Sequence, residues 1–184
     1  MSEAGHVAWM LTASALVLLM TPGLAFFYGG LVRGKNVVST MMYSYVSMAV
    51  VSVMWVLWGY SLAFGAGGDF IGNLDFVGFK DVSASGEDGG ISPMLFAIFQ
   101  MMFAIITPAL ITGAFVERFK FTTYIVFLVV WVTLVYVPIT HWVWASDGWI
   151  AGLGALDFAG GIVVHASAGI AAIVVAKMIG TRRN

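Results

Sequence analysis

The sequence contains no cysteine and very little charge. Only 9% of its 184 residues are Asp, Glu, Lys or Arg, whereas 61% are hydrophobic and the mean hydropathy is +0.99. Without cysteine the chain has neither a disulfide framework nor a thiolate for metal binding or catalysis. A soluble domain of this length does not carry so much apolar surface, so the composition indicates a membrane protein.

The few charges are clustered along the chain. Five long windows contain no Asp, Glu, Lys or Arg: 4–32, 36–68, 89–116, 121–146 and 158–176. Each can hold the roughly 20 residues that a helix needs to cross a bilayer. They lack the alternation of apolar and polar residues that marks strands, and they are too long for barrel strands. We therefore predict an all-α polytopic membrane protein whose five transmembrane helices cover residues 7–31, 37–64, 92–116, 121–144 and 158–179.

The basic residues fall almost entirely on one side of this arrangement. Seven of the eight follow the first, third or fifth span, and only Lys80 lies on the opposite, acidic side. Cytoplasmic loops of membrane proteins carry an excess of Lys and Arg. The pattern predicts a multi-pass protein of the cell (inner) membrane, with its N-terminus outside and residue 184 on the cytoplasmic side.

Two ionisable residues, Asp157 and His165, mark the fifth span. His165 is the only ionisable side chain between Asp157 and Lys177. At about 1.5 Å per residue it lies roughly 12 Å along the helix from Asp157. An ionisable group inside a membrane is by default a candidate for a transport or proton pathway. Gly161 and Gly169 flank it, which predicts close approach of another helix and an inward-facing histidine. A histidine satisfied by a neighbouring helix explains the pattern equally well.

Asp157 stands at the predicted start of the fifth helix, on its outer side. A carboxylate there can accept hydrogen bonds from free backbone N–H groups and faces the positive end of the helix dipole. We favour this structural role over direct contact with a substrate.

Aromatic residues follow one face of the third span. Phe96, Phe99, Phe103 and Thr107 are three or four residues apart, and Gln100 lies beside them. Residues at this spacing share one face of a helix. Such a stripe is more often used for packing or lipid contact, but aromatic faces also attract cations. The stripe is therefore a candidate binding wall only if the substrate is a cation.

The sequence offers little else that carries chemistry. It has no zinc-ligand spacing, phosphate loop or nucleophile elbow, and its basic residues are too few and too scattered for nucleic acid. We predict no enzyme activity, no catalytic residue, no metal and no cofactor. One rival is a redox or haem subunit with His141 and His165 as ligands, although these lie at different depths on adjacent helices. Another rival is a purely structural subunit.

Taken together, several motifs resemble the ammonium transporter (Amt/Rh) family. The strongest is GALDFAGGIVVH at 154–165, which is similar to the family's fifth-helix signature. Further similar segments are PGLAFFYGGLVR at 22–33, FQMMF at 99–103, Glu117-Arg118, and PITHWVW at 138–144. The resemblance runs through all five predicted spans in order.

The resemblance implies a role for each matching residue. Phe103 and Trp144 match the aromatic walls of an outer ammonium-recruitment site. Phe103, with Phe99 beside it, also matches the stacked phenyl gate. Asp157 matches a carboxylate that shapes the site from behind, and His165 matches the first of two pore histidines.

Trp144 also points to one branch of the family. Rh proteins usually lack this tryptophan, so the resemblance favours the Amt branch. One extra residue between Trp144 and Asp157, relative to some members, leaves Trp149 as a competitor for the same place. Tryptophan is common at membrane interfaces, and that ordinary role is the alternative for both.

Members of the family have eleven spans, built as two inverted five-helix repeats and a final helix. The residues 1–184 resemble the first repeat, so we expect the N-terminal half of an ammonium transporter domain, with the second gate phenylalanine and pore histidine beyond residue 184. The resemblance implies transport of ammonium or ammonia, with methylammonium as an analogue, through a narrow apolar pore. It also implies contact with membrane lipid, a homotrimer and a PII-type regulatory protein at the cytoplasmic face. An ammonium-sensing membrane domain of a signalling protein is the alternative.

Overall fold

The computed structural model describes residues 3–86 and 90–181, and this part of the chain is helical without any strand. Five segments are long and apolar enough to cross a membrane: Ala4–Gly30, Gly34–Phe64, Pro93–Ala114, Phe121–Gly152 and Gly161–Ile179. The predicted all-α fold with five spans is confirmed. Residue 184, which is predicted to lie on the cytoplasmic side, is outside the described residues, as are Glu87, Asp88, Arg182 and Arg183.

Several spans are assembled from shorter helical elements. The α-helices are α1 (Glu3–Gly30), α2 (Val37–Met54), α3 (Tyr60–Phe64), α4 (Pro93–Ile111), α5 (Phe121–Trp131), α6 (Val137–Trp144), α7 (Trp149–Gly152) and α8 (Ser167–Ile179). The 3-10 helices are η1 (Gly34–Asn36), η3 (Val77–Phe79) and η4 (Thr112–Ala114). The π-helical turns are η2 (Trp55–Gly59), η5 (Val132–Tyr136) and η6 (Gly161–Ala166).

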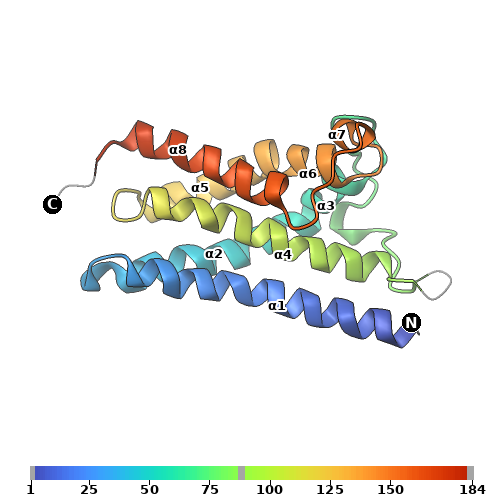
Figure 1. The fold of residues 1–184 in the computed structure, drawn as a ribbon, viewed down its shortest axis with the longest axis horizontal. Coiled ribbons are helices and arrows are strands. Elements are labelled where there is room, and N and C mark those ends of the chain that lie inside the picture. The colour runs from blue at the N-terminus through green and yellow to red at the C-terminus, as the bar shows by residue number, and fades with distance from the viewer. Residues whose placement is uncertain (1–2, 87–89, 182–184) are drawn as a thin grey trace.

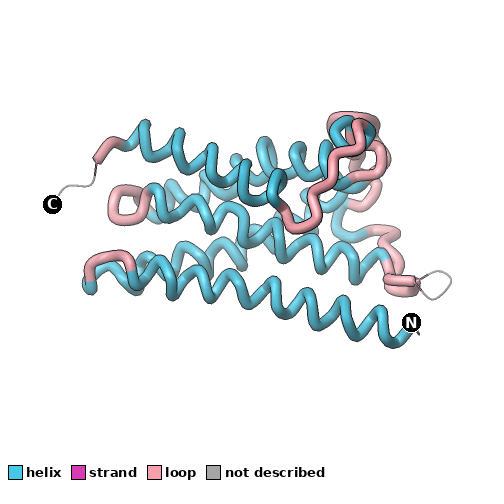
Figure 2. Tube along the Cα trace, in the orientation of Figure 1, coloured by secondary structure: helices cyan, strands magenta, loops and turns pink. Residues whose placement is uncertain are grey.

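The spans run back and forth along one common direction (Figure 1), and the connections gather at the two ends of the bundle (Figure 2). Because the number of spans is odd, the two ends of the described chain lie at opposite ends of the molecule. The end that holds α3, α7 and the N-terminal end of α1 is the one expected to face outward. The end that holds the C-terminal end of α8 is the one expected to face the cytoplasm.

Helix α4 is the centre of the bundle and packs against α1, α2 and α8. Ser92 caps its first turn by accepting a hydrogen bond from the Leu95 amide at 3.2 Å. Side chains of the neighbouring spans donate to α4 carbonyl oxygens: Tyr28 to Leu110 at 2.7 Å, Ser47 to Ile105 at 2.6 Å and the Trp55 indole to Ala97 at 3.0 Å. Polar groups within a bilayer need such internal partners, so these bonds fix α4 in place.

The outer loop after α3 is held by the end of the fourth span. The two ring nitrogens of the buried His141 lie 2.9 Å and 2.6 Å from the carbonyl oxygens of Ala63 and Gly68. The next two carbonyls also accept hydrogen bonds, at Asp69 from the Trp149 amide and at Phe70 from the Trp142 indole. These contacts fasten the first part of the loop to α6 and to the start of α7.

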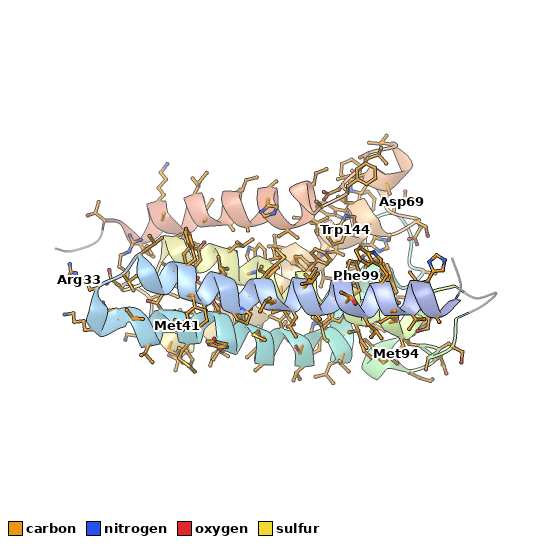
Figure 3. The ribbon with its side chains drawn as sticks, turned by 60° about the horizontal axis from the view of Figure 1, so that its bottom comes forward. Arg33, Met41, Asp69, Met94, Phe99 and Trp144 are labelled. Carbon is orange, nitrogen blue, oxygen red and sulfur yellow. The ribbon has the colours of Figure 1, made fainter. Side chains whose placement is uncertain are left out.

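The opposite end of the bundle is joined by polar contacts between three connections. The Asn36 amide donates to a Glu117 carboxylate oxygen at 2.6 Å. The Arg118 guanidinium donates to the carbonyl oxygens of Ala114 and Gly180. These residues tie the ends of the first, third and fifth spans together, and Arg33 lies at the same end (Figure 3).

Candidate functional site

A small pocket lies among the third span, the end of the fourth and the start of the fifth. Its volume is about 240 Å³. The residues that line it are Phe96, Phe99, Gln100, Phe103, Trp144, Asp157, Phe158 and Gly160. Phe99 and Trp144 lie near each other in the outer half of the bundle (Figure 3). The structure therefore brings together four of the residues predicted for the site: Phe99, Phe103, Trp144 and Asp157.

The aromatic walls of the pocket meet edge to face. The ring centroids of Phe99 and Phe103 are 5.1 Å apart, and those of Phe103 and Trp144 are 5.7 Å apart, with interplanar angles of 81° and 72°. The Trp144 indole also donates to the backbone carbonyl of Asp157 at 3.2 Å. Trp149 instead packs against Trp142, at 6.0 Å, and does not line the pocket. Of the two candidate tryptophans, Trp144 is the one that lines this pocket.

Asp157 supports the pocket through the backbone of the fifth span. One carboxylate oxygen, Oδ2, accepts hydrogen bonds from the amides of Ile162 and Val163, both at 3.0 Å. Gly160 has a left-handed backbone with φ 75°, and a Cβ there would stand 2.8 Å from Val164. The span consequently begins at Gly161 rather than at the predicted residue 158, and the carboxylate caps its first turn.

His165 lies in the π-helical turn η6 and does not line the pocket. Its amide donates to the Gly160 carbonyl at 2.9 Å, the longer reach that defines a π turn. Its side chain is exposed in this chain. Val163, Val164, Ser167 and Ala168 are the buried residues of η6 and α8, so His165 lies on the uncovered face.

Among the described residues no helix approaches the face that carries His165, so the predicted close approach stays a prediction. A Cβ added to Gly169 would meet nothing within 4 Å, and one at Gly161 would meet only Asp157. The physical reason is that α4 and η4 pack against α8, and α6 against η6, on the opposite face, where Ser167 and Ala168 are buried. Gly161 and Gly169 therefore lie, with His165, on a face of the fifth span that the described residues leave open.

Comparison with known proteins decides the family. The model of the Ammonium Transporter Family matches residues 8–184. The chain belongs to the ammonium transporter family. This is a family of transporters and not of enzymes. An ammonium transporter of Bacillus subtilis is 50% identical over 184 residues, which cover 99% of this chain and 45% of that protein. Ammonium transporter Amt1 of Archaeoglobus fulgidus is 46% identical over 179 residues, which cover 97% and 44%.

Solved structures agree with this membership. The crystal structure of Candida albicans Mep2 superposes with a TM-score of 0.87 at 40% identity, covering 96% of this chain and 39% of that one. A structure described as a Sensor Amt Protein superposes with a TM-score of 0.90 at 30% identity, covering 98% and 45%. The chain thus spans less than half the length of these relatives and corresponds to their N-terminal part.

The sequence predicts no role for Gln100. It sits on α4 between Phe99 and Phe103 and is only 8% exposed. Its side-chain oxygen Oε1 is buried and has no hydrogen-bond partner among the described residues. The signal in the sequence was a single amide inside an otherwise aromatic and aliphatic stripe.

The described residues do not gather metal ligands. No group of three or more His, Cys, Asp or Glu side chains that could hold an ion occurs among them. His141 is fully buried with both ring nitrogens against carbonyl oxygens, whereas His165 is exposed on another helix. The two histidines therefore do not form the shared haem site of the rival interpretation.

Proposed function

We propose that the protein containing this chain transports ammonium or ammonia across a membrane, and that the aromatic pocket recruits the cation. The observation that carries the proposal is the pocket formed by Phe99, Phe103 and Trp144, with the Asp157 carboxylate behind it. An aromatic face over a cation contributes about 0.5–2 kcal/mol, with the larger values when water is excluded. Membership of the ammonium transporter family supports the same substrate.

The order of events follows from the depth of these residues. Phe103 and Trp144 bind ammonium at the outer side. Phe103, with the Phe99 ring beside it at 5.1 Å between centroids, belongs to the gate below, and the second gate phenylalanine lies beyond residue 184. A charged ion at the centre of a bilayer is costly, so the cation has to lose its proton or its hydration before it passes.

His165 is the polar group that receives the substrate beyond the gate. Its exposed face needs a cover, because an ionisable group facing lipid is costly. In transporters built from inverted repeats the substrate path lies at the interface of the two repeats. We assign the open face of α8 to that interface, with residues 1–184 as the first repeat and a second histidine opposite His165.

The surroundings of the protein complete the proposal. We place it in the cell (inner) membrane, in contact with lipid, with the N-terminal end of α1 outside and the C-terminal end of α8 in the cytoplasm. The basic residues Arg33, Lys35, Arg118 and Lys177 support this orientation, because they lie at the ends of the first, third and fifth spans. A homotrimer and a PII-type regulator at the cytoplasmic face follow from the family resemblance.

An ammonium sensor is the second candidate, since the chain also resembles the structure described as a Sensor Amt Protein. A sensor uses the same pocket but passes a signal to another domain instead of moving substrate.

Ammonium-dependent current in proteoliposomes on a supported membrane tests the proposal and separates the two functions. A transporter gives a saturable current with the full-length protein. A sensor binds ammonium without sustained current. Absence of both current and binding refutes the proposed substrate.

A further inference from the structure

We propose that the side-chain oxygen of Gln100 accepts a hydrogen bond from the ammonium cation in the aromatic pocket. Gln100 would then be a substrate-binding residue in addition to Phe103 and Trp144. The inference rests on the proposed function, because it assumes that the pocket takes ammonium.

The position of Gln100 places its amide among the aromatic walls. It lies on α4, four residues after Phe96 and three before Phe103, and residues at these spacings are neighbours on one helix face. All three line the same pocket (the Phe99 and Trp144 side chains mark its place in Figure 3). Gln100 therefore places an uncharged amide on a face of α4 whose other pocket residues are aromatic.

Two other polar groups of the pocket residues, the Trp144 indole and Oδ2 of Asp157, are already engaged. The Trp144 indole donates to the Asp157 carbonyl, and Oδ2 of Asp157 accepts two backbone amides. Oε1 of Gln100, by contrast, is closed off from solvent and has no partner among the described residues, so its contact with an ion in the pocket requires rotation of the side-chain amide, which exchanges the places of oxygen and nitrogen. A buried acceptor without a donor costs about 1–3 kcal/mol, so native proteins rarely leave one unsatisfied.

The chemistry of the missing partner is narrow. An amide oxygen only accepts, so the partner has to donate a hydrogen bond. Aromatic rings around that oxygen favour a positive charge. Ammonium has four N–H donors, so one can point at the Gln100 oxygen while the charge faces the rings of Phe103 and Trp144. The Ser44 hydroxyl also has no partner, but it does not require a donor, because a hydroxyl can donate as well as accept.

Two substitutions of Gln100 in the full-length protein test the inference by ammonium-dependent current. Gln100→Met keeps the approximate size and removes the acceptor. We expect the half-saturating ammonium concentration to rise about tenfold, the ratio that corresponds to 1.4 kcal/mol, with little change in maximal current. Gln100→Glu keeps an accepting oxygen whether or not it is ionised. We expect its half-saturating concentration to equal the wild-type value or to fall below it.

Ser44→Ala is the matched control. Ser44 is also buried with an unpartnered side-chain oxygen, but it does not line the pocket, so the half-saturating concentration should stay at the wild-type value. This control separates substrate binding from a general effect of removing a buried polar atom.

The results divide cleanly. A Gln100→Met protein with wild-type half-saturation would overturn the inference, since an ordered water or another protein group would then satisfy the oxygen. The inference would also fall if Gln100→Glu raised half-saturation as much as a non-accepting residue, and this arm holds even if the Met variant does not fold. If the wild type and Ser44→Ala show no ammonium current or binding, the proposed function itself fails.

Discussion

Replacing Asp157 by alanine removes the acceptor that closes the first turn of the fifth span. The same carboxylate oxygen accepts hydrogen bonds from the backbone amides of Ile162 and Val163, both at 3.0 Å. A hydrogen bond to a charged group contributes about 1.5–3 kcal/mol, and loss of an N-cap typically costs about 0.5–2 kcal/mol. Asp157 is half-buried. We therefore expect Asp157→Ala to destabilise the protein by about 2–4 kcal/mol, between the single-cap value and two full charged bonds.

Asparagine at the same position should behave differently. Because one oxygen receives both amides, the single side-chain oxygen that remains in an Asp157→Asn variant can accept both. Asn caps helices about as well as Asp. What remains lost is the attraction between the negative charge and the helix dipole, about 0.3–1 kcal/mol. Asp157→Asn should consequently fold nearly as well as the wild type.

The measurement is thermal unfolding of the purified full-length protein in detergent, together with ammonium-dependent current. The unfolding midpoint should fall in the order wild type, Asp157→Asn, Asp157→Ala, and current should fall with it. Asp69→Ala, which removes an exposed outer carboxylate, is the control and should leave both unchanged. An Asp157→Ala protein that melts like the wild type but no longer binds ammonium would show direct substrate contact and refute the capping argument.

The site and the spans lead to three further predictions. Trp144→Leu should alter the selectivity between ammonium and methylammonium with folding intact, whereas Trp149→Leu should leave the selectivity unchanged. The opposite result would show that Trp149, and not Trp144, contacts the substrate. A cysteine introduced at Asp81 should react with an impermeant thiol reagent from outside and one at Lys35 only after permeabilisation, and the reverse pattern would overturn the orientation. His165→Ala should suppress ammonium current, while an acidic residue there should keep some conduction with changed ion selectivity; undiminished, equally selective current from His165→Ala would return this histidine to a packing role.

The sequence predicts the five spans well because the signal is simple. Bilayer thickness demands about 20 apolar residues per helix, and the charge-free windows satisfy that demand without any knowledge of packing. The boundary of the fifth span was less predictable. It depends on the left-handed backbone of Gly160 and on the cap from Asp157, and both are properties of the folded turn rather than of hydropathy.

The three π-helical turns were beyond sequence reasoning for a related reason. A π turn is a rare local departure from the α-helical pattern within a helix. Two of them, η2 and η5, face each other, since the Trp58 indole donates to Thr133 at 3.1 Å and the rings of Trp55 and Tyr136 are 6.4 Å apart. Apolar periodicity within one span carries no record of such a pairing between spans.

The site was predictable only where residues share one helix. The spacing of Phe96, Phe99 and Phe103 places them on one face. The approach of Trp144 and Asp157 to that face comes from the resemblance to a family, because two residues on different spans carry no common periodicity. The role of Gln100 depends on a lack of partners, which only the folded chain reveals.

The two parts of the proposed pathway differ in how far this chain builds them. The third span has 61% of its apolar window buried, and it carries Phe99, Gln100 and Phe103, so the outer pocket rests on a well-packed helix. The fifth span has only 22% buried, and His165 lies on its open face. Substitutions in the pocket should therefore act through contacts already present in these residues. Substitutions at His165 should act through the surface that covers α8, so their effects should depend on the partner residues opposite it.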